Sequence, residues 1–588
     1  MRKTKIICTL GPSTDKGDVL RDLIANGMNV ARFNFSHGSY EEHGGRLAKL
    51  KALREELGKP VAALLDTKGP EIRLKEFKNG VEMLEAGQTF TLTTREVEGT
   101  KEICSITYKD LPQDVHEGGI IMLDDGLIML RIEKVTDTDI TCTVLNNGKI
   151  KTKKGVNVPG VHLSMPYLSQ KDREDIIFGI QNGFDFIAAS FVRTAQDVYD
   201  IRNLLNEYDS NIRIIAKIEN REGVNNIDSI LAAADAVMVA RGDLGVEIDF
   251  TELPGIQKSI IDRSFSFGKP IVTATQMLDS MMVNPRPTRA ETSDVANAIY
   301  DGTSAIMLSG ETAAGAYPVE ALKTMSAIAE RTENEPHYRD ERFKEAHGQI
   351  SVSDATAHAA CLTAEDVNAA AIVTVSESGN TARLLSKYRP TQPIIACVMD
   401  EQVQRQLSLS WGITSLLMGP ARSTDELIEM STALAQKNGY LHNGELAVVT
   451  AGVPVGVSGT TNMIKIHMVG NCLSTGVGVG RESAALTSAS GKACVCRTLD
   501  EIRAKFKPGM VLVVPSTTNE MLEYVRDAAA LVVEEAGLNS HAAIAGKALL
   551  KPTIVGAVGA CSHIRDGLDI AVDCAQDRKS TRLNSSHM

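Results

Sequence analysis

The first 69 residues of the chain alternate short apolar runs with amphipathic stretches. Three runs, TKIICTLGPS, MNVARFNFSHG and VAALLDTKGP, have the length of buried strands and end in polar residues. The stretches KGDVLRDLIANG and EHGGRLAKLKALREELG lie between them with helical spacing, and each ends in glycine, which commonly terminates a helix. This order predicts successive strand and helix units.

The same alternation resumes near residue 169. Five further apolar runs follow, DFIAASFV, IRIIAKIEN, AVMVARGDLG, PIVTATQML and SAIMLSGET, with helical segments between them such as 194–208 and 318–332. Eight such units favour an α/β fold in which residues 1–69 and 169–345 form a closed (β/α)8 TIM barrel. A doubly wound sheet is the alternative, but no G-x-G-x-x-G motif follows the first run.

Residues 70–168 interrupt the barrel pattern after its third strand. The runs QTFTLTT, ICSITY, GIIMLDDGLIMLRIEKV and ITCTVLNNGKIKT indicate β-structure, and the turn signals DDG and NNG divide them. We expect a small β-barrel inserted in a loop at the C-terminal face of the larger barrel. In that position it would cover the active site as a lid.

The rest of the chain divides into four parts by its pattern. Residues 350–472 restart the strand and helix alternation and predict an open α/β domain. Residues 473–493 are rich in Gly, Ser and Ala and indicate a linker. Residues 494–577 hold the runs MVLVVPS, AALVVEE and PTIVGA and predict a further α/β domain, whereas residues 578–588 are polar and patternless, as in a disordered or artefactual tail.

Composition changes this picture by excluding classes of partner. The net charge of −12 and the aromatic content of 4% disfavour nucleic acids and anionic membranes. The ten cysteines are scattered, mostly inside apolar runs, as expected for reduced thiols in the cytoplasm. The apolar patch in MRKTKIICTLGPS is too short for a signal peptide, and no run reaches transmembrane length.

Two charges lie inside the apolar run IRIIAKIEN. Lys217 and Glu219 are two positions apart, so in a strand they point to the same side. A simple ion pair at a strand end is one interpretation. Asp243 follows Gly242 at the end of a later strand, however, and two carboxylates can hold a hard divalent cation while the lysine faces an anion.

Polar residues gather at the predicted C-terminal ends of the barrel strands, where the chemistry of this fold takes place. These residues are Arg32, Asn34, Ser36, His37, Asp66, Thr67, Lys68, Glu71, Arg73, Lys217, Glu219, Arg241, Gly242, Asp243, Thr273, Thr275, Gln276, Ser309, Glu311 and Thr312. Capping of the loops needs only a few of them. Several cations among acids and hydroxyls suit a phosphorylated carboxylic acid that is bound through metal ions.

Six motifs resemble those of the pyruvate kinase family. RFNFSHG, DTKGPEIR, AKIEN, MVARGDLGVE, TATQML and MLSGETA occur in this order, and the resemblance covers residues 1 to about 472. It implies an allosteric, cytoplasmic phosphotransferase of glycolysis, a homotetramer in most members. Such an enzyme moves the phosphoryl group of phosphoenolpyruvate to ADP and gives pyruvate and ATP.

The resemblance implies a role for each matched strand-end residue. Lys217 matches the lysine that stabilises the transferring phosphoryl group, and Glu219 and Asp243 match the ligands of Mg²⁺ or Mn²⁺. Arg32 matches a phosphate contact. The implied substrate contacts are Arg32, Lys217, Gly242, Asp243 and Thr275.

The resemblance also implies a potassium site and a nucleotide site. The matched K⁺ ligands are Asn34, Ser36, Asp66 and Thr67, and the nucleotide contacts are Arg73, Lys153, Asn34 and His37. Glu71 stands where potassium-dependent members carry glutamate, which predicts dependence on K⁺. The proton donor to the enolate of pyruvate stays open between Thr275 and a water relayed through Ser309 and Glu311; Lys217 is a poorer candidate because the phosphoryl group needs its charge.

Residues 376–382, SESGNTA, connect a predicted strand to a predicted helix. Hydroxyls and a glycine at a helix N-terminus can form a phosphate cradle, although a capping loop has the same composition. The resemblance implies the phosphate site of an allosteric effector, formed by Ser376, Ser378, Gly379, Asn380 and Thr381. Glu377 replaces the lysine of members activated by fructose bisphosphate, which favours a sugar monophosphate or AMP.

The segment EEAGLNSHAAIAGKALLKPTIVGA resembles the mobile, swivelling phosphohistidine domain of enzymes that use phosphoenolpyruvate. The histidine phosphorylated in those enzymes matches His541. The sequence AGLNSH departs from the expected GGxTSH, which favours a structural or regulatory role for His541.

Two other functions stay open at this point. A dikinase or synthase would carry phosphate on His541 and release AMP, but the chain lacks an ATP-grasp domain. A catalytically inactive sensor would bind a sugar phosphate through residues 376–381, but the matched catalytic set is complete.

Overall fold

The computed structural model describes residues 2–335, 338, 351–453, 461–479, 488–574 and 581–585. The chain forms two compact units, which are described separately. The first comprises Met1–Ser351, Glu377–Arg389 and Val398–Leu417. The second comprises Val352–Ser376, Pro390–Cys397 and Met418–Met588.

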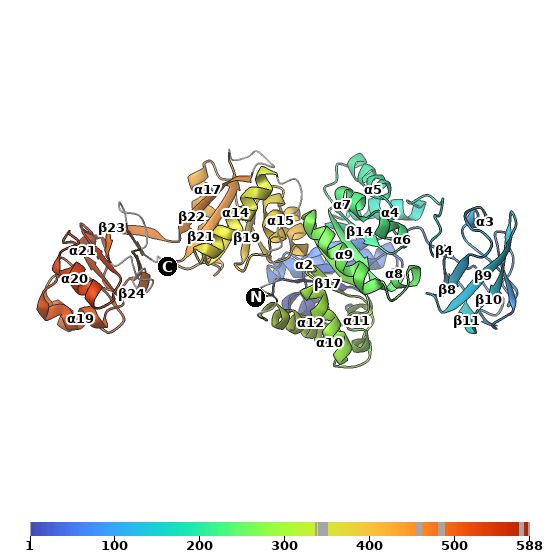
Figure 1. The fold of residues 1–588 in the computed structure, drawn as a ribbon, viewed down its shortest axis with the longest axis horizontal. Coiled ribbons are helices and arrows are strands. Elements are labelled where there is room, and N and C mark those ends of the chain that lie inside the picture. The colour runs from blue at the N-terminus through green and yellow to red at the C-terminus, as the bar shows by residue number, and fades with distance from the viewer. Residues whose placement is uncertain are drawn as a thin grey trace. The chain divides into compact units, whose positions relative to one another are not determined.

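Eight parallel strands close into a barrel in the first unit, as predicted (Figure 1). In barrel order they are β1 (Lys5–Thr9), β17 (Ala305–Leu308), β16 (Ile271–Ala274), β15 (Ala236–Ala240), β14 (Arg213–Ile218), β13 (Phe186–Ala189), β3 (Ala62–Asp66) and β2 (Val30–Asn34). Parallel strands covered on both faces are nearly continuous apolar runs, which explains why these segments are so apolar. Ile7, Leu64 and Met238 fill the barrel interior, while neighbours such as Ile6 and Leu65 pack in the outer core cluster.

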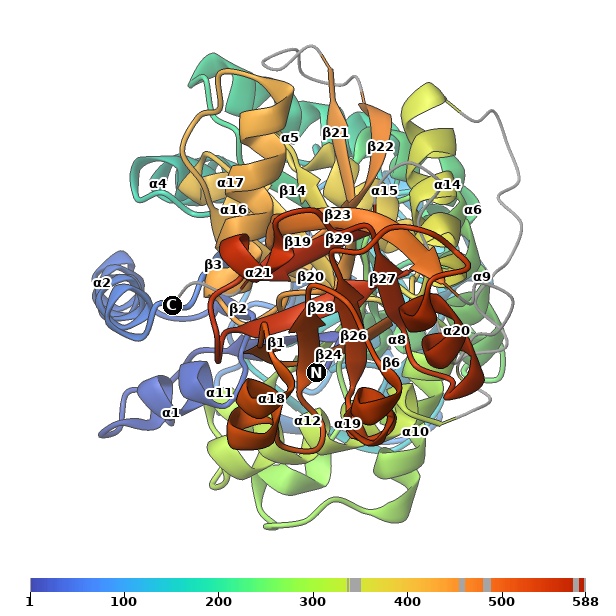
Figure 2. The ribbon, with the colours of Figure 1, turned by 90° about the vertical axis from the view of Figure 1, so that its left-hand side faces the viewer.

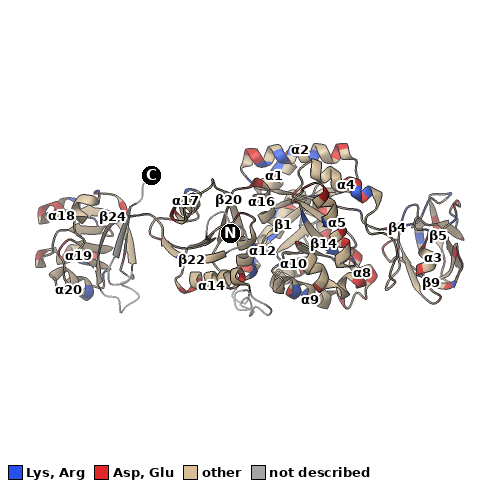
Figure 3. Ribbon diagram, turned by 90° about the horizontal axis from the view of Figure 1, so that it is seen from above, with Lys and Arg blue, Asp and Glu red and all other residues tan. Residues whose placement is uncertain are grey.

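Helices follow most of the strands and are fixed by sequence-encoded caps. They are α1 (Val19–Ala25), α2 (Tyr40–Leu57), α4 (Gln170–Gln181), α5 (Ala195–Glu207), α6 (Arg221–Asn225), α7 (Ile227–Ala233), α8 (Arg241–Glu247), α9 (Leu253–Ser266), α10 (Arg289–Tyr300), α11 (Gly310–Ala313) and α12 (Pro318–Glu333). Ser39 and Glu42 form a capping box at the start of α2, and Gly58 ends it with a φ of 60°. Glutamates lie near both ends of this helix, and Lys and Arg lie between them (Figure 3).

The inserted segment forms a seven-stranded sheet and a two-stranded sheet around a core of its own. The large sheet has the order β4 (Ile72–Arg73), β12 (Gly155–Asn157), β8 (Ile120–Leu123), β9 (Ile128–Val135), β10 (Asp139–Val144), β6 (Thr89–Thr93) and β7 (Ile103–Ser105). The small sheet pairs β11 (Gly148–Lys151) with β5 (Val81–Leu84), and α3 (Leu111–Asp114) is the helix of this part. A bridge between Leu74 and Ile106 joins the two ends of the large sheet, which gives it the expected barrel-like closure.

The segment Val398–Leu417 belongs to the compact unit of the barrel, although the sequence pattern groups it with the α/β domain. It contains α16 (Glu401–Gln406), the 3-10 turn η2 (Leu407–Leu409) and β20 (Ile413–Leu417). Leu409 is buried in the same cluster as the barrel interior, and Lys5 Nζ donates a hydrogen bond to the carbonyl of Ile413 at 2.6 Å. These two contacts attach the segment to the barrel.

The second unit begins with an open α/β sheet, as expected. β19 (Ile394–Val398), β18 (Ala371–Val375) and β21 (Leu446–Gly452) pair in parallel, and β22 (Thr461–Met468) adds an antiparallel edge. Helices α14 (Val352–Asp366) and α17 (Thr424–Lys437) belong to this part. The edge strand β22 was not among the predicted strands, because its exposed face makes its pattern weaker.

The last part closes into a second barrel with the strand order β23 (Asn471–Val479), β27 (Thr553–Val555), β26 (Ala530–Val533), β25 (Val511–Val514), β24 (Ser488–Val495), β28 (Asp569–Asp573) and β29 (Thr581–Ser585). Its helices are α18 (Leu499–Lys505), α19 (Leu522–Asp527), α20 (His541–Ala548) and α21 (Ala560–His563). Figure 2 looks onto this part, with the helices around its strands. No helix in the described ranges is long and apolar enough to cross a membrane.

Two predictions about this part are wrong. The expected linker, 473–493, is strand over 473–479 and 488–493, because its small residues permit close packing. A Cβ on Gly476 would lie 2.7 Å from the carbonyl oxygen of Val555, and a Cβ on Gly491 would lie 2.6 Å from that of Gly509. The tail 578–588 was expected to be disordered or artefactual. Residues 581–585 form β29, so disorder is wrong for them, since antiparallel pairing with β23 and β28 uses backbone groups and needs no apolar pattern; an artefactual origin stays a prediction. Residues 575–580 and 586–588 lie outside the described ranges.

Candidate active site

Three charged side chains are connected at the ends of neighbouring barrel strands. Arg32 Nε lies 2.5 Å from Asp66 Oδ2, and Lys217 Nζ lies 3.1 Å from Asp66 Oδ1. The exposed fraction is 8% for Lys217 and 1% for Asp66. The barrel thus brings together two cations that are far apart in the sequence and binds them through one buried carboxylate.

Glu219 lies beside Lys217, as the two-residue spacing predicted. Its Oε1 is 2.9 Å from Lys217 Nζ, and its Oε2 accepts a hydrogen bond of 2.6 Å from the backbone amide of Phe191. The side chain is fully buried. Phe191 holds a φ of 55°, a backbone conformation uncommon for a bulky residue, and it directs its amide at this carboxylate.

Ser190, at the end of β13, completes this network and was absent from the predicted site. Lys217 Nζ donates to its Oγ at 2.7 Å, and its hydroxyl reaches the carbonyl of Thr67 at 2.7 Å and Asp66 Oδ1 at 3.2 Å. The signal was available, because DFIAASFV ends in a hydroxyl as the other barrel strands end in polar residues. The ends of the first and fourth strands were both left out of the list.

The buried charges shift one another's pKa values. Burial alone would lower the pKa of Lys217, but the carboxylates of Asp66 and Glu219 outweigh burial and raise it. Burial likewise opposes ionisation of Asp66, but Arg32 and Lys217 overcome it and lower the pKa of that carboxyl. Burial raises the pKa of Glu219, and the nearby Asp243 adds to the shift. Lys217 therefore keeps its positive charge.

Gly242 and Asp243 lie in the first turn of α8, directly after β15. The amide of Gly242 donates to Thr275 Oγ1 at 2.7 Å, and that hydroxyl donates to the carbonyl of Ala274 at 2.6 Å. Thr275 is thus in contact with α8, as the sequence grouped them. The amide of Gly242 and the hydroxyl of Thr275 form a pair of groups that suits a carboxylate.

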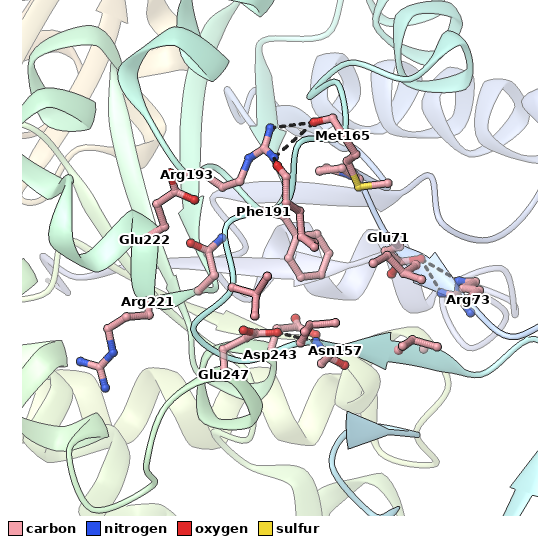
Figure 4. A pocket seen from close by; sticks show the side chains of 18 of the residues that line it. Glu71, Arg73, Asn157, Met165, Phe191, Arg193, Arg221, Glu222, Asp243 and Glu247 are labelled. Atoms are coloured by element: carbon pink, nitrogen blue, oxygen red, sulfur yellow. Dashed lines mark hydrogen bonds and ion pairs between the residues drawn. The ribbon is translucent and has the colours of Figure 1, made fainter. Parts of the chain in front are cut away.

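A cavity of about 540 Å³ lies between the barrel end and the inserted sheets. Among its lining residues are His37, Glu71, Arg73, Asp243 and Glu247 (Figure 4). Lys217 and Glu219 are buried and are not among them, whereas Phe191, whose amide donates to Glu219, does line the cavity. Asp243 is therefore the link between the cavity and the buried charge network.

The structure brings Arg73 to the cavity but not Lys153. Arg73 Nε donates to Glu71 Oε2 at 2.7 Å, and its Nη1 donates to the carbonyl of Lys153 at 2.9 Å. The ammonium of Lys153 pairs with Glu76 at 3.2 Å and is largely exposed. Lys154 lines the cavity instead and pairs with Asp124 at 2.6 Å. Lys154 was not among the predicted site residues.

The residues matched to a potassium site lie on adjacent strand ends. Asn34 and Asp66 are paired in the register of β2 and β3, and Thr67 directly follows β3. Asn34 Oδ1 accepts a hydrogen bond of 3.1 Å from the amide of Ser36. The sheet therefore gathers the four predicted residues with amide, hydroxyl, carboxylate and carbonyl oxygens.

The acids of the site fit a magnesium ion that the substrate helps to hold. No cluster of three His, Cys, Asp or Glu side chains suited to a metal occurs in the parts of the chain that the structure describes. Mg²⁺ is usually held by one or two carboxylates together with substrate phosphates and water. Glu219 Oε1 is buried, and its partner in the described ranges is the ammonium of Lys217 at 2.9 Å, so this oxygen already faces a cation and could bind a second one.

Backbone amides occupy both carboxylate oxygens of Glu311. Its two carboxylate oxygens accept hydrogen bonds from the amides of Leu278 at 3.1 Å and Ser309 at 2.7 Å. Burial raises the pKa of this carboxyl. Ser309 Oγ is buried and has no hydrogen-bond partner within the described ranges. The hydroxyls of Thr275 and Ser309 are therefore better placed to move a proton than Glu311.

Three of the predicted effector residues, Ser376, Ser378 and Gly379, precede α15 (Asn380–Lys387), and the other two open it. Gly379 caps this helix with a φ of 75°, and Arg383 Nη2 donates to the carbonyl of Ser378 at 2.7 Å. Asn380 and Thr381 form the first turn, whereas Ser376 follows β18 and belongs to the other compact unit. The loop has the glycine and hydroxyl groups that the prediction required.

Both ring nitrogens of His541 have side-chain partners. Thr517 Oγ1 lies 2.8 Å from Nδ1, and Asn519 Oδ1 lies 2.9 Å from Nε2. The histidine opens α20, which Ser540 caps. Both nitrogens thus have a hydrogen-bond partner in this arrangement, and the structural or regulatory role favoured by the sequence stays a prediction.

Comparison with known proteins gives consistent results along the chain. Residues 1–322 match the family model described as pyruvate kinase, barrel domain, and residues 354–467 match pyruvate kinase, alpha/beta domain. Residues 506–577 match the PEP-utilising enzyme, mobile domain.

Individual relatives are similar over nearly the whole chain. A pyruvate kinase of Geobacillus stearothermophilus is 51% identical and covers 97% of both chains. A pyruvate kinase of Bacillus licheniformis is 48% identical and covers 98% of both. The crystal structure of a pyruvate kinase from Cryptosporidium parvum has a TM-score of 0.75 and 40% identity, and the match covers 79% of this chain and 96% of that one.

Proposed function

The chain belongs to the pyruvate kinase family, and from this premise we propose which of its residues carry out the reaction. Enzymes of this family are phosphotransferases that move the phosphoryl group of phosphoenolpyruvate to ADP and give pyruvate and ATP. The buried network of Arg32, Asp66, Lys217 and Glu219 at the barrel mouth is the observation that supports the assignment.

Lys217 and Arg32 stabilise the phosphoryl group in transfer. Phosphoryl transfer depends mainly on positioning and on neutralising the charge of the equatorial oxygens. Asp66 and Ser190 hold the ammonium of Lys217 at 3.1 and 2.7 Å, so the cation needs little reorganisation when the charge moves. The raised pKa of Lys217 keeps it cationic and unsuited to donating the proton.

Glu219 and Asp243 hold the divalent cation, Mg²⁺ or Mn²⁺. A cation bound there would neutralise negative charge on the substrate oxygens. Asn34, Ser36, Asp66 and Thr67 hold K⁺. Glu71 forms an ion pair with Arg73, and both residues line the cavity proposed for ADP. An acid at position 71 supports dependence on K⁺.

The substrate carboxylate binds the amide of Gly242 and the hydroxyl of Thr275. These two groups are hydrogen-bonded to each other at 2.7 Å and would turn to the incoming carboxylate. The hydroxyl of Thr275, or water beside Ser309, then delivers the proton to the enolate carbon. ADP occupies the neighbouring cavity, where Arg73 and His37 contact it; Lys153 and Asn34 do not line this cavity and are not assigned to the nucleotide. The volume of about 540 Å³ suits a ligand of this size.

A phosphorylated effector binds at Ser376, Ser378, Gly379, Asn380 and Thr381 and activates the enzyme. Glu377 would repel a second phosphate, so the effector is a sugar monophosphate or AMP. We also propose that the chain acts as a homotetramer in the cytoplasm. His541 serves structure or regulation; covalent phosphate on His541 with release of AMP would instead favour the dikinase alternative.

A coupled assay for pyruvate, with phosphoenolpyruvate, ADP and Mg²⁺, tests the proposal. The wild type should be active, and its activity should fall on removal of Mg²⁺ or K⁺. Lys217→Met should abolish transfer with unchanged circular dichroism, while Lys134→Met, on the exposed face of β9, should keep full activity. Full activity of Lys217→Met would contradict the role of this lysine.

A further inference from the structure

The turn after β16 has an unfavourable backbone at two consecutive residues. Thr275 has a φ of 71° and Gln276 a φ of 53°. Side chains other than glycine seldom adopt this left-handed region, and a β-branched residue such as threonine does so least. Such a conformation persists only where surrounding contacts hold it, and it is often found at functional sites.

The guanidinium of Arg241 forms hydrogen bonds with the backbone of this turn. Its Nη2 donates to the carbonyl of Thr275 at 2.8 Å, and its Nε reaches the same oxygen at 3.3 Å. On the other side, Nη1 and Nη2 each lie 2.7 Å from a carboxylate oxygen of Asp294 on α10. The exposed fraction of Arg241 is 9%, so the guanidinium is largely shielded from water, whereas the side chain of Asp294 is 36% exposed.

We infer that Arg241 and Asp294 are positioning residues that set the hydroxyl of Thr275 for the reaction. Arg241 directly precedes Gly242, whose amide is 2.7 Å from Thr275 Oγ1. One guanidinium therefore connects the first turn of α8, the strained turn and α10. This inference rests on the substrate contact proposed above for Thr275.

The planar fork of arginine explains why another cation cannot do the same. Arginine can meet a carboxylate with two parallel bonds and still direct Nε to a third acceptor, whereas lysine is a single point donor. Arg241→Lys therefore keeps the charge and loses the geometry. Asp294→Asn keeps the size of the side chain but removes its negative charge, which weakens its two hydrogen bonds with the guanidinium of Arg241.

A double-mutant cycle in the full-length protein tests the inference. Arg241→Lys is measured in the wild type and in Thr275→Ala, with kcat and KM for phosphoenolpyruvate and for ADP. Misplacing a reactive group by about 1 Å can cost on the order of 100-fold, so we expect kcat/KM for phosphoenolpyruvate to fall roughly 10- to 100-fold. In the Thr275→Ala background the further loss should be below about threefold, and KM for ADP should not change.

Controls separate positioning from folding. Arg263→Lys, an exposed arginine of α9 paired with Asp228, should leave kinetics unchanged. If Arg241→Lys is too unstable to be assayed, Asp294→Asn replaces it in the same double-mutant cycle. We then expect a smaller fall in kcat/KM for phosphoenolpyruvate.

The outcomes distinguish this inference from the proposed function. If Thr275→Ala is impaired but Arg241→Lys multiplies the loss by the same factor in both backgrounds, the positioning role is overturned and the substrate contact stands. If Thr275→Ala has wild-type kinetics, the proposed contact fails and the inference fails with it. A loss confined to kcat, equal in both backgrounds, would also overturn the positioning role, because a general structural defect acts in this way.

Discussion

Among the individual side chains, Lys217 shows how a buried cation is kept charged. Two carboxylates and one hydroxyl lie within 3.1 Å of its ammonium. An unpaired ion in the same place would be strongly destabilised, and its pKa would fall rather than rise. The positive charge of Lys217 is thus maintained by the same neighbours that fix its position.

Ser190→Ala should lower kcat without changing the fold. The hydroxyl is 2.7 Å from Lys217 Nζ, and a hydrogen bond to a charged group contributes about 1.5 to 3 kcal/mol, which corresponds to roughly 10- to 100-fold in rate. Steady-state kinetics check this value. The control is Ser229→Ala, whose exposed hydroxyl bonds only within its own helix; equal activity of the two variants would contradict the role of Ser190.

Lys5 should make stability depend on pH in the alkaline range. Burial lowers its pKa to about 7, and Arg2 adds to this effect. Between pH 7 and about 10.4 the unfolded chain holds a proton that the native protein has released, so stability rises with pH by up to about 1.4 kcal/mol per unit. Urea unfolding of the wild type and Lys5→Met at several pH values measures the difference.

The stability of the wild type relative to Lys5→Met should increase as the pH rises through this window and level off below pH 7. A difference that stays constant from pH 6 to 10 would show that Lys5 is protonated in the native protein. Titration of other groups cancels in this comparison.

Among the helices and strands, local sequence signals predicted the ends of helices well. They did not predict the strands whose backbones pack closely against their neighbours. The capping box of α2 and the αL glycine at its end follow directly from residue types. Strands β23 and β24, by contrast, are rich in Gly, Ser and Ala and have little propensity of their own. They are strands because they pair with neighbouring strands. Their small residues allow those backbones to approach closely.

Gly491→Ala should destabilise the last barrel. The new Cβ would lie 2.6 Å from the carbonyl oxygen of Gly509, and overpacking of this kind costs about 1 to 3 kcal/mol. Thermal unfolding checks the sign. The matched change is Gly45→Ala in α2, where no atom lies within 4 Å of the new Cβ and the helix should gain up to about 1 kcal/mol.

For the chain as a whole, the barrel recruits a segment from outside its own stretch of sequence. Leu409 belongs to the cluster that fills the barrel interior together with Ile7, Leu64 and Met238. Arg405 Nε donates to the buried carboxylate of Asp185 at 2.8 Å, which adds a polar link to the same unit. The stability of the catalytic barrel therefore depends on residues 398–417.

Leu409→Ala should destabilise the first compact unit by about 2 to 5 kcal/mol, because truncating a buried leucine leaves a cavity. Loss of activity with urea reports on this unit. Leu417→Ala, at a position 42% exposed, is the control and should change the midpoint little. Equal midpoints for the two variants would show that Leu409 does not support the barrel.

Much of the site was within reach of the sequence because a (β/α)8 barrel places its strand ends on one rim. The residues at those ends include Arg32, Asp66, Lys217 and Glu219. The structure joins these four side chains in a row by three contacts of 2.5, 3.1 and 2.9 Å. The order of the strands around the barrel followed from their order along the chain. Ser190 was missed by omission, whereas Lys154 could not be told from Lys153 by pattern alone.

The alternation of apolar and polar positions was enough to determine the eight strands, their covering helices and the residues at their ends, because burial on both faces of a parallel sheet imposes that pattern on each segment. Only the tertiary structure decided which carboxylate binds which cation, which segment fills the barrel interior and which glycine-rich stretches become strands. Those outcomes depend on distances between residues remote in sequence, and on backbone pairing that needs no particular side chains, so no local pattern can specify them.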